Sequence, residues 1–289
     1  MKTVLFKINT YFSSPAEGLM AANLFRKAVY VYLVLNAIQL FPIYGELYGS
    51  GSLIVPFPFP KFSFSLTLNL LSLPAFENYY WLFFLIQVSA CVLGFFSIYP
   101  RICAVLVWFT TVNLSHRIYL LDTGGDLLLN IMVFYLLFIS PERSKQSNII
   151  SNILDNTFIL ACKIQLIVVY ALSALFKLIQ PDWLNGSAMY FVLSMKEFSL
   201  PFLRQIFLEH KIILMIFTYS ALLYQILFPF FIWSKRLKKK LIIAGLIMHI
   251  FIAVFIGLFN FSIVMICCYL LFTEKAFAEK CMRKIKIRL

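Results

Sequence analysis

One lysine stands inside an otherwise apolar run that ends in the segment 175–189. Lys177 follows about twenty mostly apolar residues that begin near Thr157, so its ammonium must either extend to a membrane interface or be used inside a protein cavity. Trp183 and Gly186 come next and are typical of a membrane–water boundary, where an indole is favoured and a turn can form. Lys177 is therefore the first candidate for function, and a lysine that only extends to the interface is the alternative.

A second group of polar residues closes another apolar run. Asn113, His116 and Arg117 have helical spacing and therefore share one face of a helix. Gly124 and Gly125 allow a tight turn after this helix. The sequence thus predicts a polar face near one membrane surface, followed directly by a turn.

A carboxylate follows that turn at a comparable depth. Asp126 falls in the first turn of the next predicted helix, where the helix dipole favours a negative charge. Because an unpaired charge is costly in an apolar environment, we expect Arg117 and Asp126 to pair with each other, with Lys177 or with water. The three side chains are predicted to share one outward-facing cavity; the alternative is an ion-pair network that only holds the helices together.

His249 lies deeper than these residues, in the middle of an apolar run. A neutral histidine there either contacts a ligand or forms a hydrogen bond inside the helix bundle. Gln87 and Gln225 are also polar within apolar runs, and interhelical hydrogen bonds explain them better than substrate contacts.

The composition places the chain among membrane proteins. Hydrophobic residues make up 62% of its 289 residues and charged residues 13%, and the mean hydropathy is +0.89. These values predict an all-α, polytopic transmembrane helix bundle with the lipid bilayer as its main partner. The net charge of +13 does not indicate nucleic-acid binding, because the basic residues lie between and after the apolar runs. The spacing of the cysteines and histidines predicts neither a metal site nor a disulfide framework.

Eight apolar runs predict about eight spans in one membrane domain, residues 24–273. A predicted interfacial segment, 1–23, precedes this domain, and a basic tail, 274–289, follows it. Residues 241–273 could instead form one long bent helix, which would leave seven spans. The eight runs have the following bounds: 24–44, 79–98, 102–121, 126–140, 157–179, 211–233, 241–258 and 260–273.

The distribution of basic residues favours eight spans over seven. With eight spans, eighteen lysines and arginines fall on the side of the termini and four on the opposite side. This asymmetry is the one that the positive-inside rule expects for two cytoplasmic termini. We therefore expect an integral membrane protein with eight spans and both termini in the cytoplasm.

Two outer loops are long enough to cover a cavity. The first contains the proline-rich stretch 55–61, which cannot form a spanning helix and is predicted to be an extended, aromatic lid. The second contains the apolar piece 188–193, which is predicted to be a helix in or along the interface.

The order and spacing of several short motifs resemble those of vitamin K-dependent gamma-glutamyl carboxylases and of the related bacterial HTTM proteins. The resemblance covers residues 20–273, and its likeness to the small bacterial members implies a protein of the bacterial plasma (inner) membrane. Its motifs are Lys177-Leu, Asp182-Trp and Gly186-x-x-Met in the segment 175–189, Tyr48-Gly-Ser-Gly, Val55-Pro, Leu93-Gly, Pro100-Arg-Ile, and Asn113 through Gly124-Gly-Asp.

This resemblance implies a role for Lys177 as the base that deprotonates reduced vitamin K. Desolvation supports that role because it favours the neutral amine. Asp126 falls near the position of a functional histidine of the animal enzymes, and a carboxylate can accept a proton but cannot present a neutral N–H. The carboxylases also carry a large lumenal domain after their spans, where this sequence has about sixteen residues, so glutamate carboxylation is not expected to carry over intact.

Two functions follow as hypotheses. The first is a carboxylase-like membrane enzyme, a lyase or oxidoreductase that binds a lipid-soluble ligand such as a reduced quinone, and with it a peptide substrate. Lys177 and Asp126 would be its catalytic residues, and the following would contact the ligand: Asn113, His116, Arg117, Trp183 and His249. The second is a non-catalytic membrane protein for peptide or toxin maturation or export, in which the charged residues only stabilise the fold.

Overall fold

The structure is a computed structural model that describes residues 2–52, 54, 70–73, 75–141, 148–196 and 201–287. All regular elements in these ranges are helical. The chain forms two compact units: residues Met1–Cys162 with Thr273–Leu289, and residues Lys163–Phe272. The predicted all-α fold is therefore confirmed for the described part of the chain, and each unit is considered by itself below.

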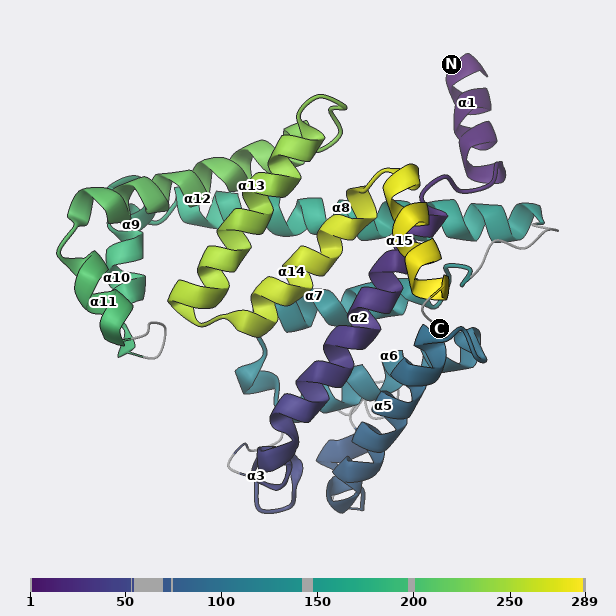
Figure 1. The fold of residues 1–289 in the computed structure, drawn as a ribbon, viewed down its shortest axis with the longest axis horizontal. Helices are drawn as coiled ribbons and strands as arrows, with labels where there is room; N and C mark the ends of the chain where they lie inside the picture. The colour runs from purple at the N-terminus through teal and green to yellow at the C-terminus, as the bar shows by residue number, and fades with distance from the viewer. Residues whose placement is uncertain are drawn as a thin grey trace. The chain divides into compact units, whose positions relative to one another are not determined.

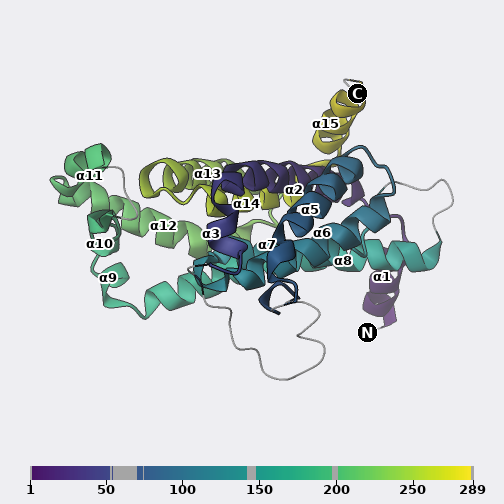
Figure 2. The same cartoon turned by 90° about the horizontal axis from the view of Figure 1, so that it is seen from below.

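The first unit contains three helices that pack side by side, α2, α5 and α6 (Figures 1 and 2). Helix α7 packs on α6, and α15 packs on α2. The helices of this unit are α1 (Lys2–Ser13), α2 (Leu19–Leu40), α3 (Tyr44–Tyr48), α5 (Tyr80–Phe95), α6 (Pro100–Arg117), α7 (Gly124–Leu136), the first part of α8 (Ile149–Leu178) and α15 (Lys275–Ile287). Short 3₁₀ turns lie at Phe41–Ile43, Leu70–Ser72, Glu77–Tyr79 and Tyr119–Leu121.

The contact between α2 and α5 depends on a glycine. A Cβ atom on Gly94 would lie 2.6 Å from a ring carbon of Tyr30, so only glycine allows this tyrosine to pack against the α5 backbone. The chain then turns tightly into α6, with positive φ angles at Ser97 and Tyr99, and Pro100 occupies the first turn of α6, where its missing N–H costs nothing. At the opposite ends of α5 and α6 from this turn, an aromatic cluster around Tyr44 and Phe84, whose rings stack, joins α2, α3, α5 and α6.

The second unit combines the end of α8 with a helical hairpin, α13 and α14 (Figure 1). Gly257 has a φ of +79°, a conformation that favours glycine, and it separates the π-helical turn Ile252–Ile256 from α14. The region 241–273 is therefore two packed helices rather than one long bent helix. The other elements are α9 (Pro181–Leu184), α10 (Ala188–Ser194), α11 (Pro201–Leu208), α12 (Lys211–Phe231), α13 (Lys238–Phe251), α14 (Phe259–Tyr269) and the 3₁₀ turn Leu270–Phe272.

A helix covers each of the eight predicted apolar runs, but only some of these helices have the length and hydropathy of a full membrane span. Four qualify among the described residues: Leu19–Tyr48, Ile149–Leu178, Lys211–Phe231 and Lys238–Ile256. A fifth is added if Phe259–Phe272 and Lys275–Ile285 are counted as one broken span. The apolar helices Tyr80–Phe95 and Gly124–Leu136 are shorter. Either could cross a bilayer only if the bilayer thinned locally or if flanking residues extended the span.

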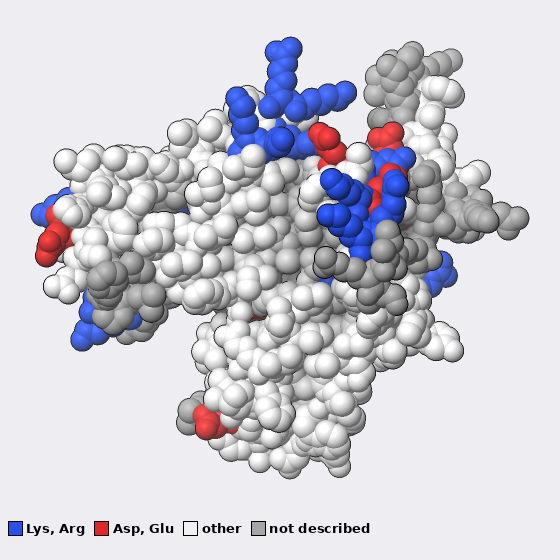
Figure 3. Space-filling model, in the orientation of Figure 1, with Lys and Arg blue, Asp and Glu red and all other residues white. Residues whose placement is uncertain are grey.

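Other predicted features have different outcomes. The helix predicted at 188–193 is confirmed as α10, and the predicted N-terminal segment contains α1. The proline-rich lid predicted at 55–61 lies outside the described residues. Basic side chains gather over the connection between α12 and α13 and, separately, over α15 (Figure 3).

A substitution at Gly245 in α13 can test how tightly the second unit is packed. A Cβ atom on Gly245 would lie 2.2 Å from the hydroxyl oxygens of both Tyr224 and Tyr269. We therefore expect Gly245→Ala to destabilise the protein by about 1–3 kcal/mol, the usual effect of overpacking, measured as thermal or denaturant unfolding in detergent micelles. Gly51→Ala is the control, because a Cβ there meets nothing within 4 Å; similar losses in the two variants would contradict the packing argument.

Candidate functional site

The amine of Lys177 is held by two side chains from other helices. Lys177 lies in the last turn of α8, and its Nζ donates a hydrogen bond to Oε1 of Gln225 on α12 at 2.9 Å. The same Nζ lies 4.7 Å from the ring centroid of Trp183 on α9, a distance at which a cation and an indole attract each other. The structure thus brings together two predicted site residues, and it gives Gln225 the interhelical hydrogen bond that the sequence predicts.

The backbone after α8 is fixed by local sequence. Gln180 is extended, as expected for a residue before proline, and Pro181 begins α9. Gly186 has a φ of +81°, which lets the chain turn back towards α12. The hydroxyl of Tyr219 on α12 donates to the carbonyl of Leu184 at 2.8 Å. These contacts hold α9, and with it Trp183, beside the end of α8.

Arg117 and Asn113 hold the described ends of the connection between α3 and α5 against α6. The two terminal nitrogens of Arg117 donate to the carbonyl oxygens of Ile54 and Gly49, at 2.9 and 3.0 Å, and the arginine is almost fully buried. Asn113 is fully buried and accepts a hydrogen bond from the backbone N–H of Leu70 at 2.7 Å. His116, the third residue of the predicted polar face, is half-buried in the last turn of α6.

Asp126 caps the helix in which it lies. Its Oδ2 accepts hydrogen bonds from the backbone N–H and the hydroxyl of Thr123, at 2.8 and 2.7 Å. The Thr123 hydroxyl in turn accepts from the backbone of the first turn of α7, which completes a capping box. The prediction that Asp126 lies in the first turn of this helix is confirmed.

A second carboxylate, Asp122, lies beside Asp126 and was not among the residues predicted from the sequence. Asp122 accepts a hydrogen bond from the hydroxyl of Ser115, and this hydroxyl itself accepts from Nδ2 of Asn130 at 2.8 Å. Burial raises the pKa of the Asp122 carboxyl to about 7, partly offset by the Ser115 hydrogen bond and reinforced by the negative charge of Asp126. Asp122 is therefore a candidate for a carboxyl group that changes its charge near neutral pH.

His249 belongs to a buried cluster of tyrosines. Its Nε2 lies 2.8 Å from the hydroxyl of Tyr170 on α8, and the Tyr170 hydroxyl also forms a hydrogen bond with that of Tyr269 on α14. The Tyr269 hydroxyl lies 2.8 Å from that of Tyr224 on α12. All four side chains are buried. The sequence gives little indication of this cluster, because tyrosines in apolar runs resemble other aromatic core residues. The clearest indication is the four-residue spacing of Gly245 and His249, which places both on one face of a helix.

The predicted site residues divide between the two units. Lys177, Trp183 and His249 belong to the second unit, and the following belong to the first: Asn113, His116, Arg117 and Asp126. The cavity that Arg117, Asp126 and Lys177 were predicted to share therefore stays a prediction. Within each unit, the structure adds residues to the site: Asp122 in the first, and Tyr170, Tyr224 and Tyr269 in the second.

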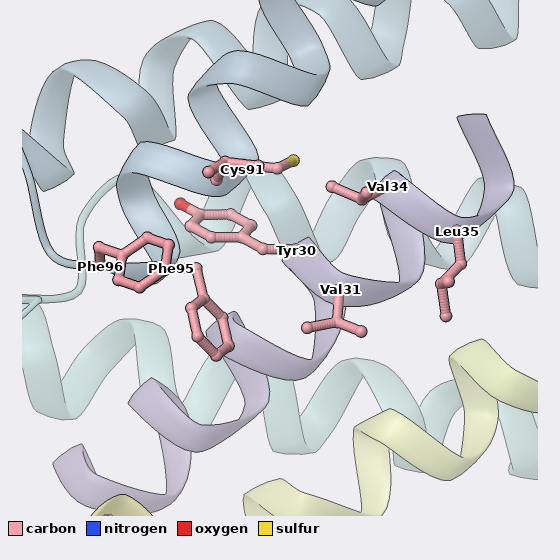
Figure 4. Close-up of a pocket in the computed structure, with 8 residues that line it drawn as sticks. Tyr30, Val31, Val34, Leu35, Cys91, Phe95 and Phe96 are labelled. Atoms are coloured by element: carbon pink, nitrogen blue, oxygen red, sulfur yellow. The ribbon is translucent and has the colours of Figure 1, made fainter. Parts of the chain in front are cut away.

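An apolar cavity of about 200 Å³ lies between α2 and α5 in the first unit. Figure 4 shows the ring of Tyr30 beside Cys91 and Phe95, with Leu35 at the other end of the cavity. Its remaining lining residues are Val31, Val34, Val92 and Phe96. Apart from the Tyr30 hydroxyl and the Cys91 thiol, the lining is apolar and suits a hydrocarbon chain.

The raised pKa of Asp122 makes the stability of the first unit depend on pH. The folded protein binds the Asp122 proton more tightly than the unfolded chain, whose carboxyl has a pKa of 3.8, so stability is lost as pH rises from about 4 to about 7. We expect Asp122→Asn to remove this loss, which amounts to roughly 1–2 kcal/mol for a partly exposed group. Unfolding temperatures across this pH range test the prediction, with Glu274→Gln, which neutralises an exposed carboxylate, as the control. An unchanged pH profile in Asp122→Asn would contradict it.

Comparison with known proteins gives one distant relative. The chain is similar to YitO of Bacillus subtilis (strain 168), described as an uncharacterized protein, with 28% identity over 182 residues. The similarity covers 57% of this chain and 58% of YitO, so the chain matches somewhat more than half of that protein's length. No family model matches the chain, and no solved structure does.

Proposed function

We propose that this chain is a membrane protein that holds a lipid-soluble, quinone-like ligand beside the end of α8 and uses Lys177 as a base. The observation that carries the proposal is the placement of the Lys177 amine, which Gln225 and Trp183 hold from two other helices. A lysine that only extends to water needs neither partner. A base in an enzyme needs both its position and its orientation fixed.

The three side chains suit proton transfer from a hydroxyl on an aromatic ring. A reduced quinone would supply that acidic hydroxyl when bound. The neutral amine of Lys177 accepts the proton, and the Gln225 carbonyl oxygen, 2.9 Å from Nζ, stabilises the ammonium that forms. The face of Trp183 stabilises the same positive charge. This chemistry agrees with the resemblance to the vitamin K-dependent carboxylases, in which a lysine acts as the base.

The proposal includes the topology: eight spans with both termini in the cytoplasm of a bacterium. A helix at each of the eight apolar runs supports it, as does the separation of α13 from α14 at Gly257. The basic clusters over α15 and over the α12–α13 connection (Figure 3) would then both face the cytoplasm, as the positive-inside rule expects. The similarity to a Bacillus subtilis protein supports a bacterial source.

A non-catalytic role in peptide or toxin maturation or export is the second candidate, and two contacts favour it. The carboxylate of Asp126 forms part of a capping box, and two donors of Arg117 bind backbone carbonyls. If Lys177 is likewise only an interhelical link to Gln225, the polar residues stabilise the fold and the function lies elsewhere.

Binding of a short-chain naphthohydroquinone to the protein in nanodiscs, without oxygen, separates these functions. We expect the wild type to bind it as the anion without releasing a proton to the medium, because Lys177 keeps the proton. Lys177→Arg should still stabilise the anion but release about one proton per anion formed, since the guanidinium is already charged. Lys177→Met should bind the ligand in its neutral form. Absorbance of the bound ligand and a pH indicator dye give the two readings.

Lys163→Met is the matched control, because it removes another half-buried lysine of α8. Its ligand form and proton release should equal those of the wild type. The base role fails if the wild type binds no hydroquinone, or if Lys177→Arg matches the wild type while Lys177→Met only lowers the yield of folded protein. The last result would favour the structural role.

The topology is tested with a natural reporter. Cys281 on α15 is partly exposed, whereas the other five cysteines are buried. With a cytoplasmic tail, a membrane-impermeant maleimide should label Cys281 only after the cells are permeabilised. Lys211→Cys, at an exposed position in a predicted outer segment, should be labelled in intact cells. Labelling of Cys281 in intact cells would rule out the eight-span orientation.

A further inference from the structure

The exposed face of α15 is basic. Lys280, Arg283 and Lys284 are exposed, and their spacing places them on one face of the helix (Figure 3). The opposite face contains Ala278, which is fully buried, and Met282, which is partly buried. Because α15 packs on α2, we assign this apolar face to the contact with α2. Helix α15 is therefore fixed to the first unit on one side and presents three cations on the other.

Phe277 adds an aromatic ring to the basic face. It precedes Lys280 by three residues and Lys284 by seven, so it lies beside both on the helix surface, and it is 51% exposed. A single exposed phenylalanine is common, but a phenylalanine among cations on one side of a helix is typical of helices that lie in the membrane interface. There the ring reaches the apolar layer while the cations stay among the headgroups.

The position of α15 agrees with such an interface. Helix α2 is the first part of a candidate span, Leu19–Tyr48. Figures 1 and 2 both show α15 beside the beginning of α2, and Figure 2 shows that it runs steeply away from the direction of α2. When α2 crosses the membrane, a helix that lies across its end follows the membrane surface, and the charges of α15 keep it out of the hydrocarbon layer. This geometry puts the basic face at the depth of the phospholipid headgroups.

Neither ion pairing nor topology explains this arrangement. The described ion pair of α15 joins Arg283 to Glu279 at 3.8 Å, and an exposed pair of this kind contributes little. No carboxylate among the described residues lies within 4.0 Å of the amine of Lys280 or Lys284. The positive-inside rule depends on the number of basic residues on one side of the membrane and requires neither a common helix face nor an aromatic ring. An external anion accounts for all of these features.

We propose that α15 binds the headgroups of anionic phospholipids at the membrane surface. Arg283 and the two lysines form charge-assisted hydrogen bonds with the lipid phosphates, and the ring of Phe277 inserts between the first methylene groups of neighbouring acyl chains. A zwitterionic headgroup offers the same phosphate together with a compensating cation, so the net charge of the lipid decides the preference. This surface is separate from the proposed role of Lys177, and its test needs neither a hydroquinone nor a known orientation in the membrane.

Photocross-linking from position 277 tests the proposal. The full-length protein, with photoreactive benzoylphenylalanine in place of Phe277, is placed in nanodiscs with equal amounts of phosphatidylglycerol and phosphatidylcholine, and mass spectrometry identifies the cross-linked lipids. The same photoreactive residue in place of Ile247, which is 65% exposed on α13, gives the ratio for unselected lipid. Relative to that ratio, we expect at least a roughly fivefold preference for phosphatidylglycerol at position 277, the effect of one basic residue near an anionic headgroup.

Salt and removal of charge should both abolish this preference. The screening length falls from about 10 Å at about 0.1 M salt to about 3 Å at about 1 M, so the ratio at position 277 should then approach that at position 247. The triple variant Lys280→Gln, Arg283→Gln, Lys284→Gln should show no preference at low salt. Lys280→Gln alone should lower the preference, and it replaces the triple variant if that variant does not fold.

The triple variant Lys235→Gln, Arg236→Gln, Lys239→Gln is the matched control. It removes the same residue types, two lysines and one arginine, from exposed positions between the end of α12 and the first turn of α13, and it should leave the preference at position 277 unchanged. A lipid ratio at position 277 that equals the ratio at position 247, or that neither salt nor the α15 substitutions change, would overturn the proposal. Absence of cross-linked lipid at position 277 would overturn it as well, because it would place α15 away from the bilayer.

Discussion

The structure depends on pairing polar groups inside an apolar chain that has little water to satisfy them. Arg26 is almost fully buried in α2, and its guanidinium donates to the carbonyls of Leu136 and Ile139 at the end of α7, at 2.9 and 2.6 Å. Arg117 does the same for the carbonyls of Gly49 and Ile54. Backbone carbonyls at helix ends and in loops lack an intrahelical partner, so each arginine satisfies groups that would otherwise be costly to bury.

This constraint explains which parts of the fold the sequence could predict. Apolar runs predict the positions of helices because a backbone in an apolar environment has to satisfy its own hydrogen bonds. The sequence places Asp126 in the first turn of a helix, and the Thr123-x-x-Asp126 pattern is also that of a capping box. The partners of Arg117 could not be predicted, because every residue has a backbone carbonyl and the sequence does not distinguish the carbonyls that act as acceptors. The sequence shows which charged side chains need partners but not which backbone groups provide them.

The same limit applies to the candidate site. Lys177 and Trp183 are close in sequence, so their proximity could be predicted from the chain turn between them. The hydrogen bond from Tyr170 to His249 joins residues 79 positions apart, and the one from Tyr170 to Tyr269 spans 99 positions. A tyrosine in an apolar run counts as hydrophobic whether or not its hydroxyl is used, so only the three-dimensional arrangement separates these tyrosines from ordinary core aromatics.

The kind of partner distinguishes Lys177 from the two buried arginines. Each arginine binds two carbonyl oxygens through a planar, rigid guanidinium, an arrangement that secures the backbone and leaves little freedom to exchange partners. Lys177 has one neutral amide acceptor and one aromatic face, and neither cancels its charge as a carboxylate would. Its flexible stem and single hydrogen bond let the amine change partners at small cost. The amine at the end of α8 is therefore positioned by two side chains of which neither carries an opposing charge, and a fixed position without charge neutralisation is a condition that a base has to meet.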